Sequence, residues 1–308
     1  MLHPSLATHD TSDQSITVIP RCARDDRFAS LTDLLPWLAM PHITLRDGAT
    51  LYFETHGAGP PLMLVTGLGG VATFWEPHVP AFARHFTVVL HDHRGCGRSA
   101  LSRIDYSVEQ MADDALQLMD ALGVKRAHWV GHSTGGAMGQ AIAIDHPARI
   151  DRLVLCGTWA KTDAFFRRGF ELRAMVLRAF GPEGYSKASG LALHAPSWIR
   201  DHDDVLAANE ARAHETIPVP DILLSRIAAI VAHDRREQMH RITAPTLAIG
   251  ARDDQVTPAY FTEEIGRLVP DCRTVILPHG GHFFPNVVPD TYQRILLDFL
   301  FGKAASAT

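Results

Sequence analysis

Short apolar runs recur along the chain from residue 43 onward, and they predict buried strands. Most are continuous runs of about four residues, which is typical of strands covered on both faces of a sheet. Two further short runs flank the turn at Asp47-Gly48 and predict a hairpin. The predicted strands are residues 43–45, 51–53, 62–65, 87–90, 127–130, 152–155, 246–249 and 274–277.

Helical patterns alternate with these runs. Ser107 and Gln110 have the spacing of a capping box, and Gly123 marks the end of the helix that follows. Its predicted apolar face consists of Val108, Met111, Ala112, Ala115, Met119 and Leu122. Its predicted polar, solvent-facing side consists of Asp113, Asp114, Gln117 and Asp120. The pattern therefore indicates an amphipathic helix that packs against a sheet.

The last helix has a similar pattern. Asp290 is its expected N-cap, and its apolar stripe is Tyr292, Ile295, Leu296, Phe299 and Leu300. Strands that alternate with helices require crossover connections, so the sheet is expected to be mainly parallel.

The alternation stops over residues 159–240, where helical patterns and prolines occur without a convincing strand. We therefore expect a helical insertion within an α/β core formed by residues 41–158 and 241–308. Residues 1–40 are polar and aperiodic, and we expect a weakly ordered or peripheral extension that catalysis does not need. Met40 directly precedes the recognisable pattern and could itself be a start codon.

Composition narrows the class of protein. A net charge of −5 over 308 residues argues against a nucleic-acid surface, and no apolar run approaches the roughly 20 residues of a membrane span. The N-terminus lacks the pattern of a signal peptide. The four cysteines are too irregularly spaced for a disulfide framework or a zinc site, so reduced thiols in a cytoplasmic protein are expected. Histidines are numerous, but no metal site is predicted.

The segment Gly131-His132-Ser133-Thr134-Gly135 matches the G-x-S-x-G pattern. It follows a predicted strand and precedes a predicted helix, and such a sharp turn exposes the central hydroxyl at the strand's carboxyl end. The flanking glycines remove side chains that would clash there. Ser133 is therefore the predicted nucleophile, and the alternative is a plain glycine turn with a capping serine.

A serine nucleophile needs a base and an acid that orients it. His282 follows the predicted strand 274–277 and two glycines that leave room for its ring, which favours it over His279. Asp253 and Asp254 follow the strand 246–249, and the order Ser, Asp, His is that of α/β-hydrolases. At most one of these adjacent carboxylates should face the histidine.

The oxyanion of a tetrahedral intermediate needs backbone amide donors. Thr134, the residue after the nucleophile, is expected to supply one. Leu68, in the glycine-rich turn after the strand 62–65, is expected to supply the other.

Together these segments resemble the α/β-hydrolase superfamily over residues 41–303. Residues 92–99 match that family's D-x-R-G-x-G-x-S loop, although Thr66 stands where many members have histidine. The resemblance implies that Asp254, four residues before Pro258, is the acid, and that Arg94 braces loops. It also implies that residues 159–240 form a cap over the active site. Within the superfamily, the chain is most similar to the branch of 3-oxoadipate enol-lactonases and aminoacrylate hydrolases. Residues 67–70, 191–198 and 280–282 resemble the aminoacrylate-hydrolase type.

The predicted fold is thus an eight-stranded, mostly parallel α/β-hydrolase sheet with a helical cap. The cap should determine substrate choice, and Trp159, Phe165, Phe166 and Trp198 are candidate substrate-lining residues. A small carboxylic ester or lactone is the expected substrate, cleaved without a cofactor. Carbon–carbon or enamine hydrolysis on the same triad and a non-catalytic ligand receptor are the alternatives. A haloalkane dehalogenase is disfavoured because its nucleophile is an aspartate. A homo-oligomer is compatible with the sequence.

Overall fold

An eight-stranded sheet forms the centre of the fold. The computed structural model describes residues 42–302, so the predictions for residues 1–40 lie outside the described part of the chain. The strands are β1 (His42–Thr44), β2 (Thr50–His56), β3 (Pro61–Val65), β4 (Thr87–His91), β5 (Ala127–His132), β6 (Ile150–Cys156), β7 (Thr246–Ala251) and β8 (Cys272–Leu277). Each predicted strand coincides with one of these elements.

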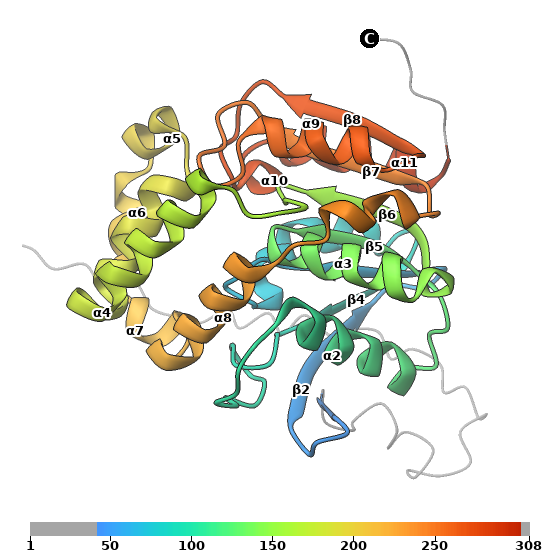
Figure 1. Ribbon diagram of the computed structural model, residues 1–308, viewed down its shortest axis with the longest axis horizontal. Coiled ribbons are helices and arrows are strands. Elements are labelled where there is room, and N and C mark those ends of the chain that lie inside the picture. Colours follow the sequence, from blue (N-terminus) through green and yellow to red (C-terminus); the bar gives the residue numbers. More distant parts are fainter. Residues whose placement is uncertain (1–41, 303–308) are drawn as a thin grey trace, which may run out of the picture. The chain divides into compact units, whose positions relative to one another are not determined.

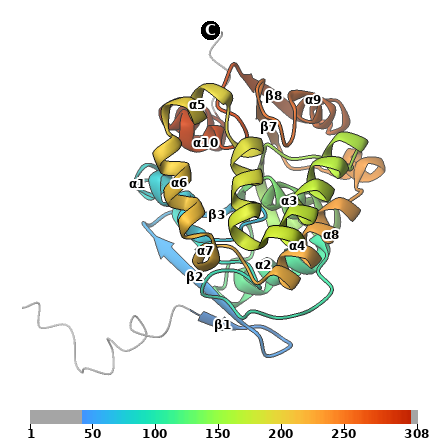
Figure 2. The same cartoon turned by 90° about the vertical axis from the view of Figure 1, so that its left-hand side faces the viewer.

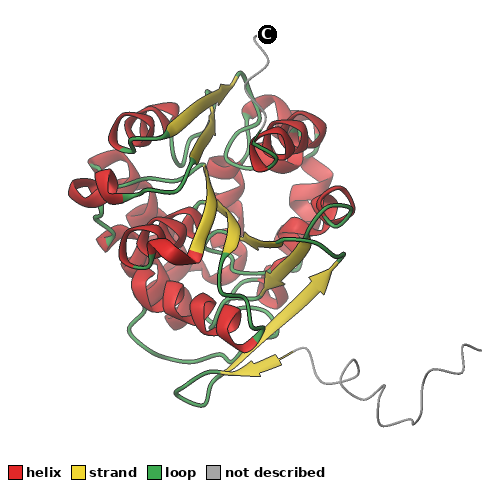
Figure 3. Ribbon diagram, turned by 90° about the vertical axis from the view of Figure 1, so that its right-hand side faces the viewer, coloured by secondary structure: helices red, strands yellow, loops and turns green. Residues whose placement is uncertain are grey.

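The sheet is mixed at one edge and parallel elsewhere. Its order is β1-β2-β4-β3-β5-β6-β7-β8, and Figure 3 shows the strands as one twisted layer between helices. β2 runs antiparallel to both β1 and β4, whereas every pair from β4 to β8 is parallel. The carboxyl ends of β5, β7 and β8 therefore meet at one edge, as the α/β-hydrolase prediction requires.

Helices connect the strands and cover the sheet. They are α1 (Val79–Phe82), α2 (Val108–Ala121), α3 (Thr134–Asp145), α4 (Ala164–Leu193), α5 (Pro196–Asp201), α6 (Asp203–Ala211), α7 (Ala213–Thr216), α8 (Pro220–Ala232), α9 (Ala259–Leu268), α10 (Phe284–Val287) and α11 (Pro289–Leu300). Short 3₁₀ helices are η3 (Ala72–His78), η4 (Pro147–Arg149) and η5 (Arg236–Arg241).

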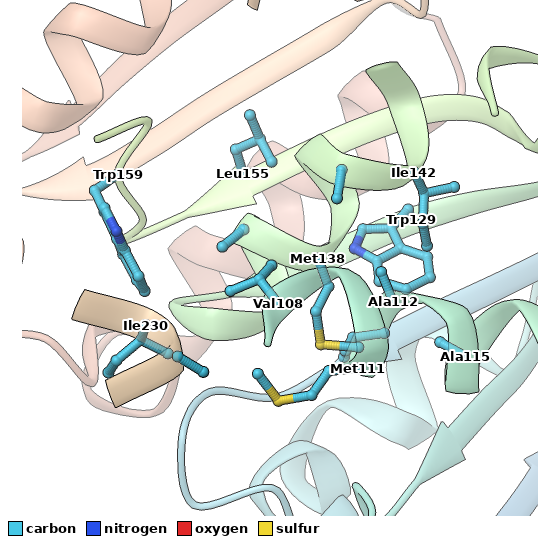
Figure 4. Close-up of a cluster of buried hydrophobic side chains, with 14 of the residues drawn as sticks. Val108, Met111, Ala112, Ala115, Trp129, Met138, Ile142, Leu155, Trp159 and Ile230 are labelled. Atoms are coloured by element: carbon cyan, nitrogen blue, oxygen red, sulfur yellow. The ribbon is translucent and has the colours of Figure 1, made fainter. Parts of the chain in front are cut away.

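Alternate residues of the central strands β3 to β7 supply two hydrophobic clusters, one on each face of the sheet. In β3, Met63 and Val65 belong to one cluster, while Leu62 and Leu64 belong to the other. Figure 4 shows the first cluster, where apolar side chains of α2 pack beside Trp129. Because both faces of the central strands β3 to β7 are buried, these strands are mainly apolar, which explains the continuous runs in the sequence.

Helix α2 begins at its predicted cap, since the Ser107 hydroxyl accepts a hydrogen bond from the Gln110 amide (3.0 Å). One polar-face prediction was wrong: Asp114 is buried, not solvent-facing. Arg94 explains the difference, because its guanidinium donates to both Asp114 oxygens (3.0 and 2.8 Å) and also pairs with Asp47. Arg94 thus ties the loop after β4 to α2 and to the β1–β2 turn, the bracing role that the resemblance implied.

Helix α11 buries its predicted apolar stripe, but it begins at Pro289 with Val288 as the N-cap. Asp290 therefore lies in the first turn and is not the cap. A proline is well suited to the first helical position because its missing N–H would have no partner there. The carboxylate of Asp290 still lies where the helix dipole favours negative charge.

Between β6 and β7 the chain forms a helical insertion made of α4 to α8 and η5, with one isolated bridge between Lys161 and Asp234. Figures 1 and 2 show α4, α5, α6 and α7 grouped beyond one end of the strands. Helix α4 is broken at Gly181, whose φ of 67° and ψ of −163° are not helical, so it has two arms. Within residues 42–302, no helix is long and apolar enough to cross a membrane.

Candidate active site

Three predicted catalytic residues lie just beyond the carboxyl ends of three parallel strands, at the same edge of the sheet. Ser133 follows β5, Asp254 follows β7, and His282 follows β8. All three are buried, with exposed fractions of 5%, 3% and 2%. Ser133 and His282 line the same cavity, and Asp254 contacts His282 from behind. The structure thus brings together residues that are separated by up to 149 positions in the sequence.

Ser133 occupies a strained turn between β5 and α3. Its φ of 53° and ψ of −116° make it the one non-glycine residue with positive φ in the described part of the chain. Such strain persists only where the surrounding structure holds it, and it is common at active sites. A Cβ on Gly131 would overlap the carbonyl of Gly135, and one on Gly135 would overlap that of Val65. The two motif glycines are therefore needed for the turn that presents the hydroxyl.

Asp254 orients His282. The Nδ1 atom of His282 lies 2.8 Å from Oδ2 of Asp254, and since a carboxylate only accepts, the imidazole donates. The Thr257 hydroxyl and the amides of Val256 and Thr257 also donate to Asp254 (2.7–2.9 Å). Burial works against its charge, but the neighbouring His282 and these donors hold the pKa of Asp254 below its usual value. With Nδ1 protonated, Nε2 of His282 is left free to accept a proton.

Asp253 has a different role. Its carboxylate accepts hydrogen bonds from the amides of Gly280 (3.2 Å) and Gly281 (2.9 Å), and so caps the loop that leads into His282. His279 is exposed and does not line the cavity of Ser133. The geometry therefore favours Asp254 and His282 over their neighbours as the acid and base.

His132 contributes to the site, although it occupies only the first variable position of the G-x-S-x-G motif. Its Nε2 lies 2.9 Å from the carbonyl oxygen of His282, and its ring stacks on Phe74 at 4.8 Å. Burial is the main cause that lowers the pKa of His132 to about 3, and the proximity of the His282 ring acts in the same direction. A neutral His132 can thus hold the His282 backbone without adding charge beside the base.

The predicted oxyanion turn lies directly against the nucleophile. A Cβ on Gly67 would sit 3.1 Å from the Cβ of Ser133. Thr134 is the first residue of α3, where backbone amides have no partner within the helix. The Leu68 carbonyl accepts from the buried Arg226 of α8 (3.1 Å), which fixes the orientation of that peptide. Donation by the amides of Leu68 and Thr134 to an oxyanion remains a prediction.

The cavity beside Ser133 has a volume of about 210 Å³ and lies between the sheet edge and α4. Phe170, Arg173, Tyr185, Ser189 and Leu193 of α4 form its cap side. The core side consists of Thr66, Gly67, Leu68, Gly69, Val71, Phe74, His132, Val256, His282 and Phe283.

The four aromatic residues predicted to line the substrate site lie elsewhere. Trp159 and Phe166 are buried against each other, with ring centroids 4.4 Å apart, and Phe165 is half exposed. Trp198 stacks between His194 (3.9 Å) and His202 (4.4 Å). Among the described residues, none of the four belongs to the wall of the Ser133 cavity. The rings of Trp159, Phe166 and Trp198 pack against other aromatic rings of the cap and core.

The cap is also hydrogen-bonded to the catalytic loop. The carbonyl of Leu193, the last residue of α4, accepts from the amides of His282 (3.0 Å) and Phe283 (3.3 Å). The backbone of the base is thus held by the cap on one side and by His132 on the other.

A family model described as alpha/beta hydrolase fold matches residues 60–285, which is most of the chain. The protein therefore belongs to the α/β-hydrolase family, and the resemblance noted from its motifs is confirmed.

Sequence relatives and solved structures show which members of the family this chain is similar to. The chain is 40% identical over 251 residues to a protein of Azorhizobium caulinodans named "Putative carbamate hydrolase RutD", covering 82% of this chain and 95% of that one. A protein of the same name from Caulobacter sp. strain K31 is 38% identical, with coverage of 83% and 97%. Among solved structures, the enol-lactonase of Burkholderia xenovorans LB400 superposes with a TM-score of 0.78 at 28% identity, covering 85% of this chain and 100% of that one.

Proposed function

We propose that this protein is a serine hydrolase that cleaves a small carbamate through a covalent intermediate on Ser133. The observation that carries the proposal is the Asp254–His282 pair, 2.8 Å apart, beside a strained Ser133 in one small cavity. The carbamate assignment draws on the relatives named for that activity, which match over most of this chain. It takes precedence over the ester or lactone expected from the motifs alone.

The mechanism follows from the positions of the three side chains. Nε2 of His282 takes the Ser133 proton as Oγ attacks the carbonyl carbon, and Asp254 stabilises the resulting imidazolium. The amides of Leu68 and Thr134 hold the oxyanion. The leaving group departs with the proton from His282. Water then attacks the carbonyl carbon of the intermediate, with His282 again as base, and Ser133 recovers its proton.

A lactone or simple ester is the second candidate. It is favoured by the structural similarity to the Burkholderia enol-lactonase over nearly the whole described fold. The two bond types use the same triad, so fold and geometry alone do not separate them. Carbon–carbon cleavage on the triad has no comparable support.

Two substrates of nearly identical shape separate these candidates. We would compare 4-nitrophenyl N,N-dimethylcarbamate with 4-nitrophenyl isobutyrate, which differ by nitrogen in place of a CH group. A carbamate hydrolase turns over both compounds continuously. An esterase turns over the isobutyrate, but releases a single equivalent of nitrophenol from the carbamate and then stalls.

The control is Ser133→Ala, which should hydrolyse neither compound above background. Turnover of any of these substrates that requires Ser133 would also exclude a purely non-catalytic ligand receptor. Unchanged hydrolysis by Ser133→Ala would refute the proposed nucleophile.

A further inference from the structure

Arg173 places a positive charge in the wall of the catalytic cavity. It lies on the first arm of α4, and its side chain is 6% exposed. Its guanidinium carbon sits 3.7 Å from the ring centroid of Phe170. Within residues 42–302, its Nε has no hydrogen-bond partner. The acidic groups that act on it electrostatically are the phenol of Tyr185 and Asp254, and Asp254 is already paired with His282.

An arginine in this environment lacks the counter-ion that buried charges normally have. Burial lowers the pKa of Arg173, but guanidinium groups in proteins stay protonated at neutral pH. Taking an unpaired charge out of water is costly, and stacking on an aromatic ring recovers only part of that cost. Buried arginines are therefore usually paired with a carboxylate or phosphate. Among the described residues, no carboxylate pairs with Arg173, and its side chain lines the cavity, where a bound anion could take that position.

The described residues in the rest of the cavity wall include no negative group that could act as the counter-ion of Arg173. Among its described lining residues there is no aspartate or glutamate, and neighbouring His132 is neutral. The Ser189 hydroxyl, on the second arm of α4, also lines the cavity and is buried without a partner. Two unsatisfied donors, one of them charged, thus lie opposite the nucleophile. Planar carboxylates match the fork of a guanidinium, and a hydroxyl can add a third hydrogen bond.

We infer that Arg173 selects substrates that carry a free carboxylate in addition to the bond being cleaved. Arg173 binds that carboxylate, with Ser189 as a second donor, and so places the scissile carbonyl at Ser133. The inference rests on the proposed function for the role of Ser133, but not for the identity of the anion. The substrate class is that of small acyl compounds bearing a carboxylate.

Monomethyl fumarate and methyl crotonate test this directly. Both are methyl esters of a trans four-carbon acid, and they differ by a carboxylate in place of a methyl group. We expect wild-type kcat/KM to be at least about 100-fold higher for the anion, the size of a buried charge contact. Arg173→Met should remove this preference mainly by raising KM for monomethyl fumarate, so that kcat/KM falls much further for this anion than for methyl crotonate. Arg173→Lys should retain part of the preference.

A wild-type enzyme that hydrolyses both esters equally well would overturn the inference, whatever the variants do. Equal losses of both substrates in a folded Arg173→Met protein, checked by thermal unfolding, would instead assign Arg173 a packing role.

Binding to Ser133→Ala, measured by calorimetry, separates this inference from the proposed function. Tight binding of monomethyl fumarate that Arg173→Met abolishes supports the carboxylate site even if no ester is hydrolysed. No preference for the anion in binding refutes it even if Ser133 proves to be the nucleophile.

Discussion

Asp254 receives four hydrogen bonds, from the His282 ring, the Thr257 hydroxyl and the amides of Val256 and Thr257. Asp254→Asn keeps the shape but presents an NH₂ group where an acceptor is required. Because the wrong tautomer of the base would then be favoured, kcat should fall by about 10⁴-fold, as found for the equivalent change in a serine protease. Steady-state kinetics on the folded variant measures this.

Asp253→Asn is the matched control. An asparagine oxygen can still accept from the Gly280 or Gly281 amide, so the loop should lose one contact and kcat should fall by about tenfold or less. A larger effect at Asp253 than at Asp254 would reverse the two assignments. Mild effects at both positions would place the acid elsewhere.

The candidate catalytic residues could be proposed from the sequence because the signals that indicate them are local. Ser133 sits in a five-residue motif between a buried strand and a helix, and His282 follows two glycines. Both signals are short in sequence. The role of His132 was not predictable, because its contact with the His282 carbonyl joins residues 150 positions apart.

At the scale of elements, Phe166 of α4 is a packing residue. It is 1% exposed and contacts the rings of Trp159, Phe170 and Phe261. Phe166→Ala should lower the free energy of unfolding by about 3–5 kcal/mol. The corresponding fall in Tm is roughly 10 °C for a domain of this size. The relative rates among substrates should stay unchanged.

Leu193→Ala is the contrasting control, because the Leu193 side chain lines the cavity. The hydrogen bond from Leu193 to His282 is made by the backbone carbonyl, so the substitution keeps it. It should alter the relative rates of short and long acyl groups with a smaller loss of stability. If Phe166→Ala changes substrate preference while Tm is preserved, the packing assignment is wrong.

Hydrophobic periodicity predicts the strands and helices, but it does not predict which residues of the cap line the cavity. An apolar stripe on a helix shows which side is buried, without showing whether the core or a cavity covers it. The aromatic residues of the cap were therefore assigned to the substrate, whereas Arg173, Tyr185 and Ser189 line the cavity. Asp114 is a related case, since its burial depends on Arg94 from another segment.

At the scale of the whole molecule, several buried histidines make stability depend on pH. Burial lowers the pKa of His91, His194 and His233 to about 4 and that of His132 to about 3. Each is neutral in the folded protein but takes up a proton below about pH 6.5 when unfolded. The contribution of these neutral histidines to the free energy of unfolding is therefore complete above pH 6.5, and it is lost as the pH falls toward about 4.

Each of these groups costs up to about 1.4 kcal/mol per pH unit in that window. Thermal unfolding at constant ionic strength should show Tm falling steadily between pH 6.5 and 4.5. His233→Gln, which keeps a polar partner for Gln140, should make this slope shallower. A Tm that is constant from pH 8 to 5 would contradict the prediction.

Residues 1–40 are predicted to be dispensable for catalysis, because the recognisable pattern begins at residue 41 and the family match at residue 60. A chain that begins at Met40 should keep kcat and KM within about twofold of the full chain, with similar Tm. A soluble but inactive product would show that this segment takes part in the site.

The carbonyl of Leu193 that holds the amides of His282 and Phe283 restricts how this enzyme can be re-engineered. A cap transplanted from a relative would act as an independent module only if α4 still ended with a carbonyl at that point. A graft that shifts the C-terminal end of α4 by one residue would misplace His282 and abolish activity toward every substrate. Directed evolution of new specificities should therefore succeed through side chains within α4, such as those at positions 173, 185 and 189, and fail through insertions or deletions near its end.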